Sequence, residues 1–191
     1  VIYLTSGIWH LGSAIYNALE VPNNRIGIHI FDPSEILQSA QLVNSSGGDW
    51  GYVTVPIRSD DRDYLKWEAF FRACSQYHLI PLVRLATYPI NSHWAEPSNL
   101  DILDFANFLN LLPWPTQNRY IILFNEPNHS KEWGGKIDPE NYVDLAQYSR
   151  DLFKSLSPDY FLLTAGLDMS APNGKETIDA LTYYRRMFAK D

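Results

Sequence analysis

A glutamate that directly follows a buried apolar run is the residue of this sequence best suited to chemistry. The run Tyr120-Ile121-Ile122-Leu123-Phe124 leads straight into Asn125-Glu126-Pro127. Hydrolysis of a glycosidic bond requires a carboxylic acid that gives its proton to the leaving oxygen, and a neighbouring amide can hold a sugar hydroxyl. Glu126 and Asn125 have these two chemistries.

Five apolar runs of this kind recur along the chain, and each is followed by a segment with helical spacing. Their near-continuous hydrophobicity is typical of parallel strands that are buried on both faces. Acidic and small polar residues at the helix starts match the free backbone N–H groups there. The strands are predicted at residues 26–31, 51–57, 79–85, 120–124 and 160–166, and the helices at 34–43, 59–77, 99 or 101–112, 138–156 and 174–189.

Five consecutive βα units predict a parallel sheet with helices, either doubly wound or of the barrel type. A doubly wound sheet usually carries a glycine-rich loop after its first strand, whereas here His29-Ile30-Phe31-Asp32-Pro33 ends that strand. We therefore predict an α/β fold of the (β/α)8 TIM-barrel type, in which catalytic groups collect at the carboxyl ends of the strands. A complete barrel takes about 250 residues, and this sequence has 191. We expect an N-terminal lead-in over residues 1–24 and an incomplete barrel over 25–191, with strands one to five and their helices.

Around Asn125-Glu126-Pro127 the chain resembles the retaining glycoside hydrolases of the (β/α)8 superfamily called clan A. In that family an Asn-Glu pair ends strand four, where the Glu is the acid/base and the Asn contacts the sugar beside the scissile bond. A second Glu, at the end of strand seven, is the nucleophile. The resemblance covers residues 26 to about 190. It implies retaining hydrolysis of a β-linked oligosaccharide or polysaccharide, with Glu126 as general acid/base and Asn125 bound to the sugar. The nucleophile would come from a strand that this sequence does not contain.

Four further residues are candidates for substrate binding. Arg84 interrupts the third apolar run with a charge that is costly to bury unpaired, so we expect it to face acids at the mouth of the barrel or to form a structural ion pair. His29 interrupts the first run; the resemblance places it at the floor of the sugar pocket, and a core histidine bound to a backbone carbonyl is the alternative. Trp94 and Trp133 follow strands three and four, where their rings can stack on sugar C–H faces.

The composition argues against several other classes of function. Only 19% of the residues are charged, with 22 acids and 15 bases, so the chain lacks the basic field that nucleic acids or anionic lipids require. The apolar runs are too short for a membrane span. The single Cys74 allows no intrachain disulfide, and the five histidines lack metal-ligand spacing. We expect neither a metal nor a cofactor.

Two other functions stay open at this point. The missing second carboxylate favours a non-catalytic carbohydrate-binding remnant or pseudoenzyme, whereas Glu126 and Arg84 together fit another hydrolase or lyase that acts on an anionic substrate. Strands one and five would be long apolar edges, so we expect a longer hydrolase, a half-barrel completed by a partner chain, or self-association through the open edges. The start at Val1 is compatible with a removed signal peptide. The resemblance slightly favours an extracytoplasmic location, because such enzymes commonly act on polysaccharides outside the cytoplasm.

Overall fold

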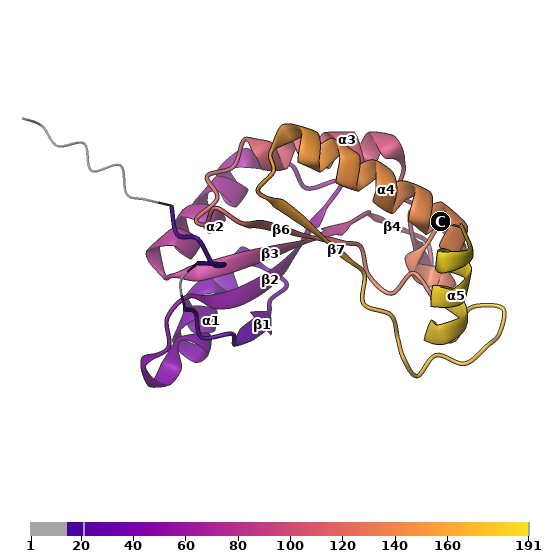
Figure 1. Cartoon of the computed structure of the whole chain (residues 1–191), viewed down its shortest axis with the longest axis horizontal. Helices are drawn as coiled ribbons and strands as arrows, with labels where there is room; N and C mark the ends of the chain where they lie inside the picture. The colour runs from indigo at the N-terminus through magenta and orange to yellow at the C-terminus, as the bar shows by residue number, and fades with distance from the viewer. Residues whose placement is uncertain (1–14, 21, 191) are drawn as a thin grey trace, which may run out of the picture.

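The main sheet contains five parallel strands in the order in which they occur along the chain (Figure 1). The computed structural model describes residues 15–20 and 22–190, so residues 1–14 of the predicted lead-in lie outside the described residues. The predicted α/β fold with a parallel sheet is confirmed. The strands, in spatial order, are β1 (Gly27–His29), β2 (Gly51–Arg58), β3 (Leu79–Ala86), β6 (Arg119–Leu123) and β7 (Tyr160–Thr164).

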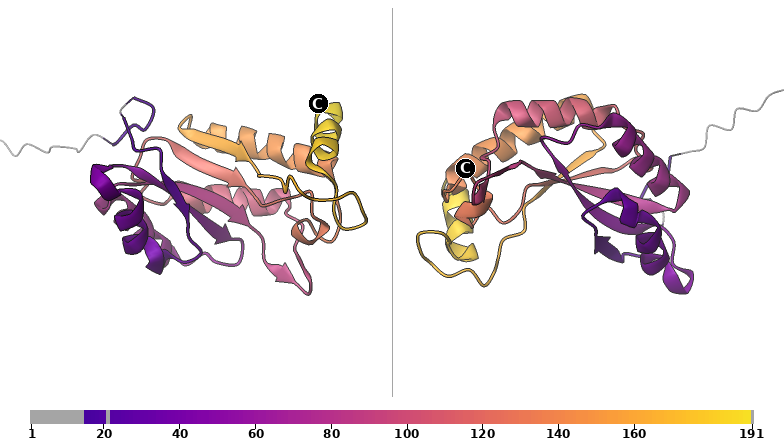
Figure 2. Two further views of the ribbon diagram at one scale, coloured as in Figure 1. Left: turned by 90° about the horizontal axis from the view of Figure 1, so that it is seen from below. Right: turned by 180° about the vertical axis from the view of Figure 1, so that it is seen from behind.

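Helices follow each of these strands and lie along the convex side of the sheet (Figure 2). Three short 3-10 helices and a two-stranded hairpin, β4 (Pro89–Ile90) with β5 (His93–Trp94), lie in the connecting loops. The 3-10 helices are η1 (Pro33–Glu35), η2 (Ser45–Gly47) and η3 (Ser130–Glu132). The α-helices are α1 (Ile36–Val43), α2 (Tyr64–Gln76), α3 (Asn99–Asn110), α4 (Pro139–Leu156) and α5 (Ala180–Lys190).

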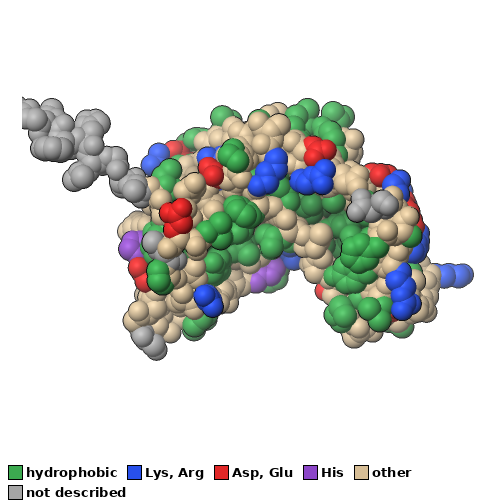
Figure 3. Space-filling view, in the orientation of Figure 1, with side chains coloured by type: hydrophobic (Ala, Val, Ile, Leu, Met, Phe, Trp, Pro, Cys, Tyr) green, Lys and Arg blue, Asp and Glu red, His purple; other side chains and the backbone are tan. Residues whose placement is uncertain are grey.

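Only one face of the sheet is covered by helices, which corrects the expectation of strands buried on both faces. In β2, Val53, Val55 and Ile57 are fully buried, whereas the alternating Thr54 and Pro56 are only half-buried. Since successive side chains of a strand point to opposite faces, the buried set faces the helices. Figure 3 shows apolar side chains around the hollow that remains on the other side.

The core lies between the helices and the buried face of the sheet. Phe70 and Phe71 of α2, Phe105 of α3 and Phe153 of α4 are all at most 2% exposed. They belong to one continuous cluster with the inward-facing valines, leucines and isoleucines of the strands. This cluster holds the strands in register, and so holds their carboxyl ends side by side.

Helix α5 begins later than its predicted start at residue 174. The Ile178 N–H donates to the Asn128 C=O (N···O 3.0 Å), and Thr177 forms an antiparallel bridge with His129. These contacts keep the segment extended until Asp179, whose carboxylate accepts from the Thr182 N–H at 3.0 Å and caps the helix. The loop after β7 is therefore fastened to the loop after β6.

No helix within residues 15–20 and 22–190 is both long enough and apolar enough to cross a membrane.

Candidate active site

The chain leaves β6 through a strained turn that carries the two central candidate residues. Phe124 has a φ of 69° and Glu126 a φ of 32°, in the left-handed region that residues other than glycine seldom adopt. The Glu126 N–H donates to the Gly166 C=O beyond β7, with an N···O distance of 3.2 Å. Such strain costs about 1–3 kcal/mol per residue and clusters at functional sites. The turn fixes Asn125 and Glu126 at the carboxyl end of the sheet.

A chain of three polar side chains runs across this end of the sheet. Arg84 Nη1, from β3, donates to Asn125 Oδ1 at 2.8 Å. Asn125 Nδ2 in turn donates to Glu132 Oε2, on η3, at 3.4 Å. Both ends of the Asn125 amide therefore contact charged groups from other segments.

Arg84 is a partly buried cation with nearby carboxylates. Burial lowers the pKa of its guanidinium, while the negative charges of Glu132 and then Glu126 act in the opposite direction. The buried Nε of Arg84 has no hydrogen-bond partner among the residues that the structure describes. Arg84 was expected to face acids at the mouth of the barrel, and the two acids whose charges act on it are Glu132 and Glu126.

A cavity of about 270 Å³ opens beside these side chains. Its polar lining includes Arg84, Asn125 and Glu132, together with Arg58 and Thr87, and its aromatic lining comes from Phe31, Trp94 and Phe124. Its volume is close to the lower limit of about 300 Å³ for ligand pockets, and its mixture of rings with a few convergent polar groups is typical of such pockets. The half-buried Trp94 belongs to the cavity wall, where its indole can meet the flat face of a sugar.

Glu126 does not line this cavity. The residue is half-buried, and its C=O accepts from the His129 N–H at 2.9 Å. Because it directly follows Asn125 in the chain, it lies next to the polar chain that borders the cavity. The structure therefore brings Arg84, Asn125 and Trp94 together in one wall, with Glu126 beside them.

His29 lies on the same face of the sheet as Arg84 but not in the cavity. It pairs in register with Thr54, which pairs with Leu82, two residues before Arg84. His29 is exposed at the edge strand rather than buried against a carbonyl. Partial desolvation, followed by the charge of Arg84, lowers the pKa of its imidazole. Its role at the pocket floor stays a prediction.

The prediction that Trp133 lines the cleft is wrong, because its side chain is completely buried. Its indole Nε1 donates to Asn141 Oδ1 at 3.1 Å, and its ring packs edge-on against Phe124 and Tyr142. The polar sequence around Trp133 indicated an exposed loop, but η3 lies on the surface and turns this one ring inward. Trp133 is therefore a core residue that packs against Phe124.

Two consecutive glycines let this loop approach the hairpin that carries Trp94. Gly134 and Gly135 have φ values of 62° and 82°, and the Gly134 N–H donates to the Trp94 C=O at 3.0 Å. A Cβ atom on Gly134 would lie 2.7 Å from the Cβ of Glu96, which real structures essentially never show. The segments that carry Glu132 and Trp94 are thereby held against each other.

Asn128 links the loop that follows β6 to the loop that follows β7. It was not predicted from the sequence. Its side chain, 0% exposed, donates to the C=O groups of Asp168 and Ile178 at 3.0 Å each and accepts from the Asp168 N–H at 3.1 Å. His129 Nε2 also lies 2.9 Å from Asp168 Oδ2. The only indication of this role in the sequence was that Asn128 lies two residues after Glu126. Glu132 was missed too, although it is an acid in the loop that follows a strand end.

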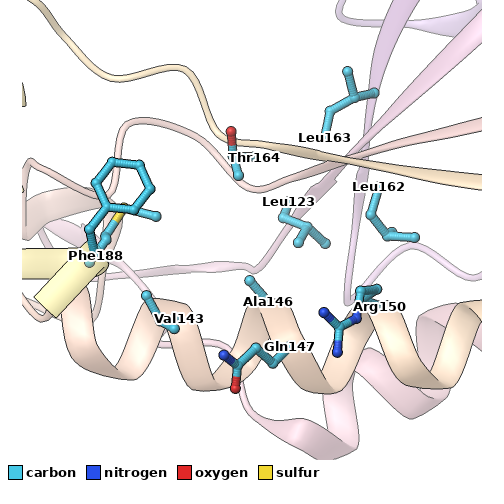
Figure 4. A pocket seen from close by; sticks show the side chains of 10 residues that line it. Leu123, Val143, Ala146, Gln147, Arg150, Leu162, Leu163, Thr164 and Phe188 are labelled. Atoms are coloured by element: carbon cyan, nitrogen blue, oxygen red, sulfur yellow. The ribbon is translucent and has the colours of Figure 1, made fainter. Parts of the chain in front are cut away.

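A second cavity, of about 290 Å³, lies between β7, α4 and α5 (Figure 4). Leu123, Leu162 and Leu163 line it from the sheet, and Val143, Ala146 and Phe188 from the two helices. No carboxylate lines this cavity among the described residues, so it offers no group for acid/base work. It borders the edge of β7 that does not face β6.

The described residues contain no group of three or more His, Cys, Asp or Glu side chains that could hold a metal ion. Cys74 is fully buried, and burial raises the pKa of its thiol well above the usual value.

No known family model matches the chain, and a search of curated proteins likewise finds no match.

Proposed function

We propose that this chain is the acid/base half of a retaining glycoside hydrolase of the (β/α)8-barrel type. One observation carries the proposal: Asn125 and Glu126 occupy the carboxyl end of the fourth of five parallel strands, beside a cavity lined by Trp94 and Arg84. The resemblance of Asn125-Glu126-Pro127 to the strand-four motif of clan A supports the same assignment.

Two features of the fold support a barrel rather than a doubly wound sheet. The strands follow chain order without a reversal, and their helices cover one face. A doubly wound sheet has a switch point and helices on both faces. The uncovered face carries the half-buried rings of Tyr52, Tyr120 and Phe161, which contact one another. These rings would form the interior of a closed barrel.

Further strands would have room beside β7. Within the described residues β7 pairs only with β6, and its Leu162 and Leu163 line the cavity of Figure 4, whose lining also includes Arg150. A following parallel strand of the same polypeptide would pair with that edge and bury Leu163, which is 39% exposed. The nucleophile of the proposed enzyme would come from such additional strands.

The chemistry proceeds in two steps. Protonated Glu126 gives its proton to the glycosidic oxygen while the nucleophilic carboxylate, about 5 Å away in retaining enzymes, attacks the anomeric carbon. The ionised Glu126 then takes a proton from the water that cleaves the glycosyl-enzyme intermediate. Asn125 holds a hydroxyl of the sugar, and Trp94 stacks on its ring.

Hydrolysis of aryl β-glycosides with a poor leaving group by the product of the complete gene tests this proposal. Glu126→Gln keeps the size of the side chain but removes its acid, and we expect the rate to fall by about 10² to 10⁴. Glu68→Gln makes the same change on the outer helix α2 and should keep the wild-type rate. An unchanged rate in Glu126→Gln would overturn the assignment.

A sugar-binding protein without catalysis is the second candidate function. This candidate is favoured because Trp94, Asn125 and Glu132 line the cavity, whereas Glu126 lies beside the cavity. Oligosaccharide binding without turnover by the complete gene product would support this candidate. A covalent adduct trapped with a 2-fluoro sugar would exclude it, because the adduct requires a working nucleophile.

A further inference from the structure

We propose that Glu132 is a positioning residue that, together with Arg84, fixes the amide of Asn125 for binding one sugar hydroxyl. The inference rests on the function proposed above and adds a residue that the motif Asn125-Glu126-Pro127 does not contain. Glu132 touches Asn125 and acts through it.

The hydrogen-bonding capacity of Asn125 leads to this assignment. A carboxamide has two N–H donors and two acceptor lone pairs. Glu132 takes one donor at 3.4 Å, and Arg84 fills one lone pair at 2.8 Å. Among the described residues no other group pairs with this amide, so one N–H and one lone pair remain. A sugar hydroxyl can both donate and accept a hydrogen bond, so one hydroxyl can pair with the remaining lone pair and with the remaining N–H.

The charges on the two partners determine how the amide is oriented. If the amide turned by 180°, its NH₂ would face the Arg84 cation and its oxygen would face the Glu132 carboxylate. Both contacts would then be repulsive, whereas in the observed orientation both are hydrogen bonds to charged groups, which are about twice as strong as neutral ones. Glu132 also supplies the largest favourable charge next to the partly buried Arg84.

The backbone of Glu132 is held firmly enough for this role. Its N–H donates to the His129 C=O at 3.0 Å. The next residue, Trp133, is completely buried, and Gly134 bonds to the hairpin at Trp94. Glu132 therefore projects toward Asn125 from a short helix that is anchored on both sides.

A double-mutant cycle tests whether Glu132 acts through Asn125. The variants Glu132→Ala, Asn125→Ala and the double variant are compared in the complete gene product by kcat/KM on an aryl β-glycoside. We expect Glu132→Ala to lose about tenfold, the low end for a hydrogen bond to a charged group. In the Asn125→Ala background it should cause no further loss, because the group that it positions is already absent. Glu132→Gln keeps an acceptor oxygen and should recover part of the loss.

Losses that multiply in the double variant would overturn the proposal, as would a Glu132→Ala enzyme with wild-type kcat/KM. Urea unfolding of each variant identifies any that fails to fold, and Glu132→Gln then provides the comparison. The variant Glu126→Gln distinguishes the two proposals. If this variant is inactive but the losses in the double-mutant cycle multiply, the proposed role of Glu132 is wrong and the proposed function still stands. If turnover is absent, the same cycle is measured as oligosaccharide affinity by calorimetry. Absence of both turnover and binding overturns both proposals.

Discussion

The two ends of the sheet are built from the same kinds of residue, aromatic rings and side-chain amides, but use them differently. At the amino end, Asn44 Oδ1 accepts from the Gly51 N–H at 2.9 Å and from Asn24 Nδ2 at 2.7 Å. Asn44 Nδ2 donates to the C=O groups of Tyr77 and His78 at 3.1 Å each. All the hydrogen-bonding capacity of this amide is used within the protein. At the carboxyl end, Asn125 uses only half of its capacity.

The aromatic rings differ in the same way. At the amino end, Trp50 is stacked between Tyr16 and His78, with ring centroids 4.0 and 4.8 Å apart. Trp50 therefore stacks on two rings of the protein, although it also lines a cavity of about 330 Å³ at this end. At the carboxyl end, Trp94 is a half-buried wall of a cavity. The comparison favours a structural role for the amino end, and the unused capacity of Asn125 among the described residues fits the sugar-binding role that we propose for the carboxyl end.

The largest effect on stability is expected from a buried tryptophan at the carboxyl end. Trp133→Ala removes the ring beneath Phe124 and should lower the free energy of unfolding by about 3–5 kcal/mol, as large core truncations do. Trp94→Ala is the matched control: it should change the urea midpoint little but abolish most sugar binding. Equal destabilisation by the two variants would contradict the distinction between a supporting and a binding tryptophan.

A smaller effect is expected from the amide at the amino end. Asn44→Ala leaves the Gly51 N–H and two carbonyl groups without their partner, which should lower the free energy of unfolding by about 1–3 kcal/mol. The kcat/KM of the folded enzyme should not change. Asn125→Ala should show the opposite pattern, with slower hydrolysis and a nearly unchanged urea midpoint. The comparison between the two ends fails if Asn44→Ala slows hydrolysis per folded molecule.

The smallest expected effect is on how much stability the protein loses at acid pH. Hydrogen bonds from Thr182 lower the pKa of Asp179 to about 2, below its usual 3.8. Because the folded pKa is the lower one, the stabilisation is complete above the unfolded pKa and is lost as the pH falls from there toward 2. Asp179→Asn keeps a capping oxygen without a titrating proton. Its urea midpoint should therefore fall less than that of the wild type between pH 5 and pH 2. Parallel curves would contradict this assignment.

Four of the five strands were predictable because each is a run of apolar residues long enough to cross the core. The first, predicted over residues 26–31, has only three residues, and Gly27 and His29 are exposed. Even so, the sequence suggested burial on both faces, and only the alternation of Val53, Val55 and Ile57 with half-buried neighbours shows that one face is uncovered. The hairpin of β4 and β5 has strands of only two residues, too short to produce a periodic pattern. The start of α5 depends on contacts with Asn128 and His129, which are distant in the sequence.

The candidate site was predictable where a residue breaks an apolar strand or follows its end. Arg84, Asn125 and Glu126 have this signature. Trp133 and Glu132 are adjacent in one polar loop, and nothing in their spacing indicates which side chain turns inward. The structure buries the tryptophan and directs the carboxylate to Asn125, so Glu132 lines the cavity and Trp133 does not.

The dependence of kcat/KM on the leaving group tests the role of Glu126 most directly. An aryl β-glycoside with a good leaving group needs no proton to depart, whereas one with a poor leaving group does. In the complete gene product, Glu126→Ala should therefore lose about 10²-fold or more on the poor leaving group and little on the good one. An equal loss on both substrates, or no loss on either, would contradict the assignment of Glu126 as the acid/base at the carboxyl end of the sheet.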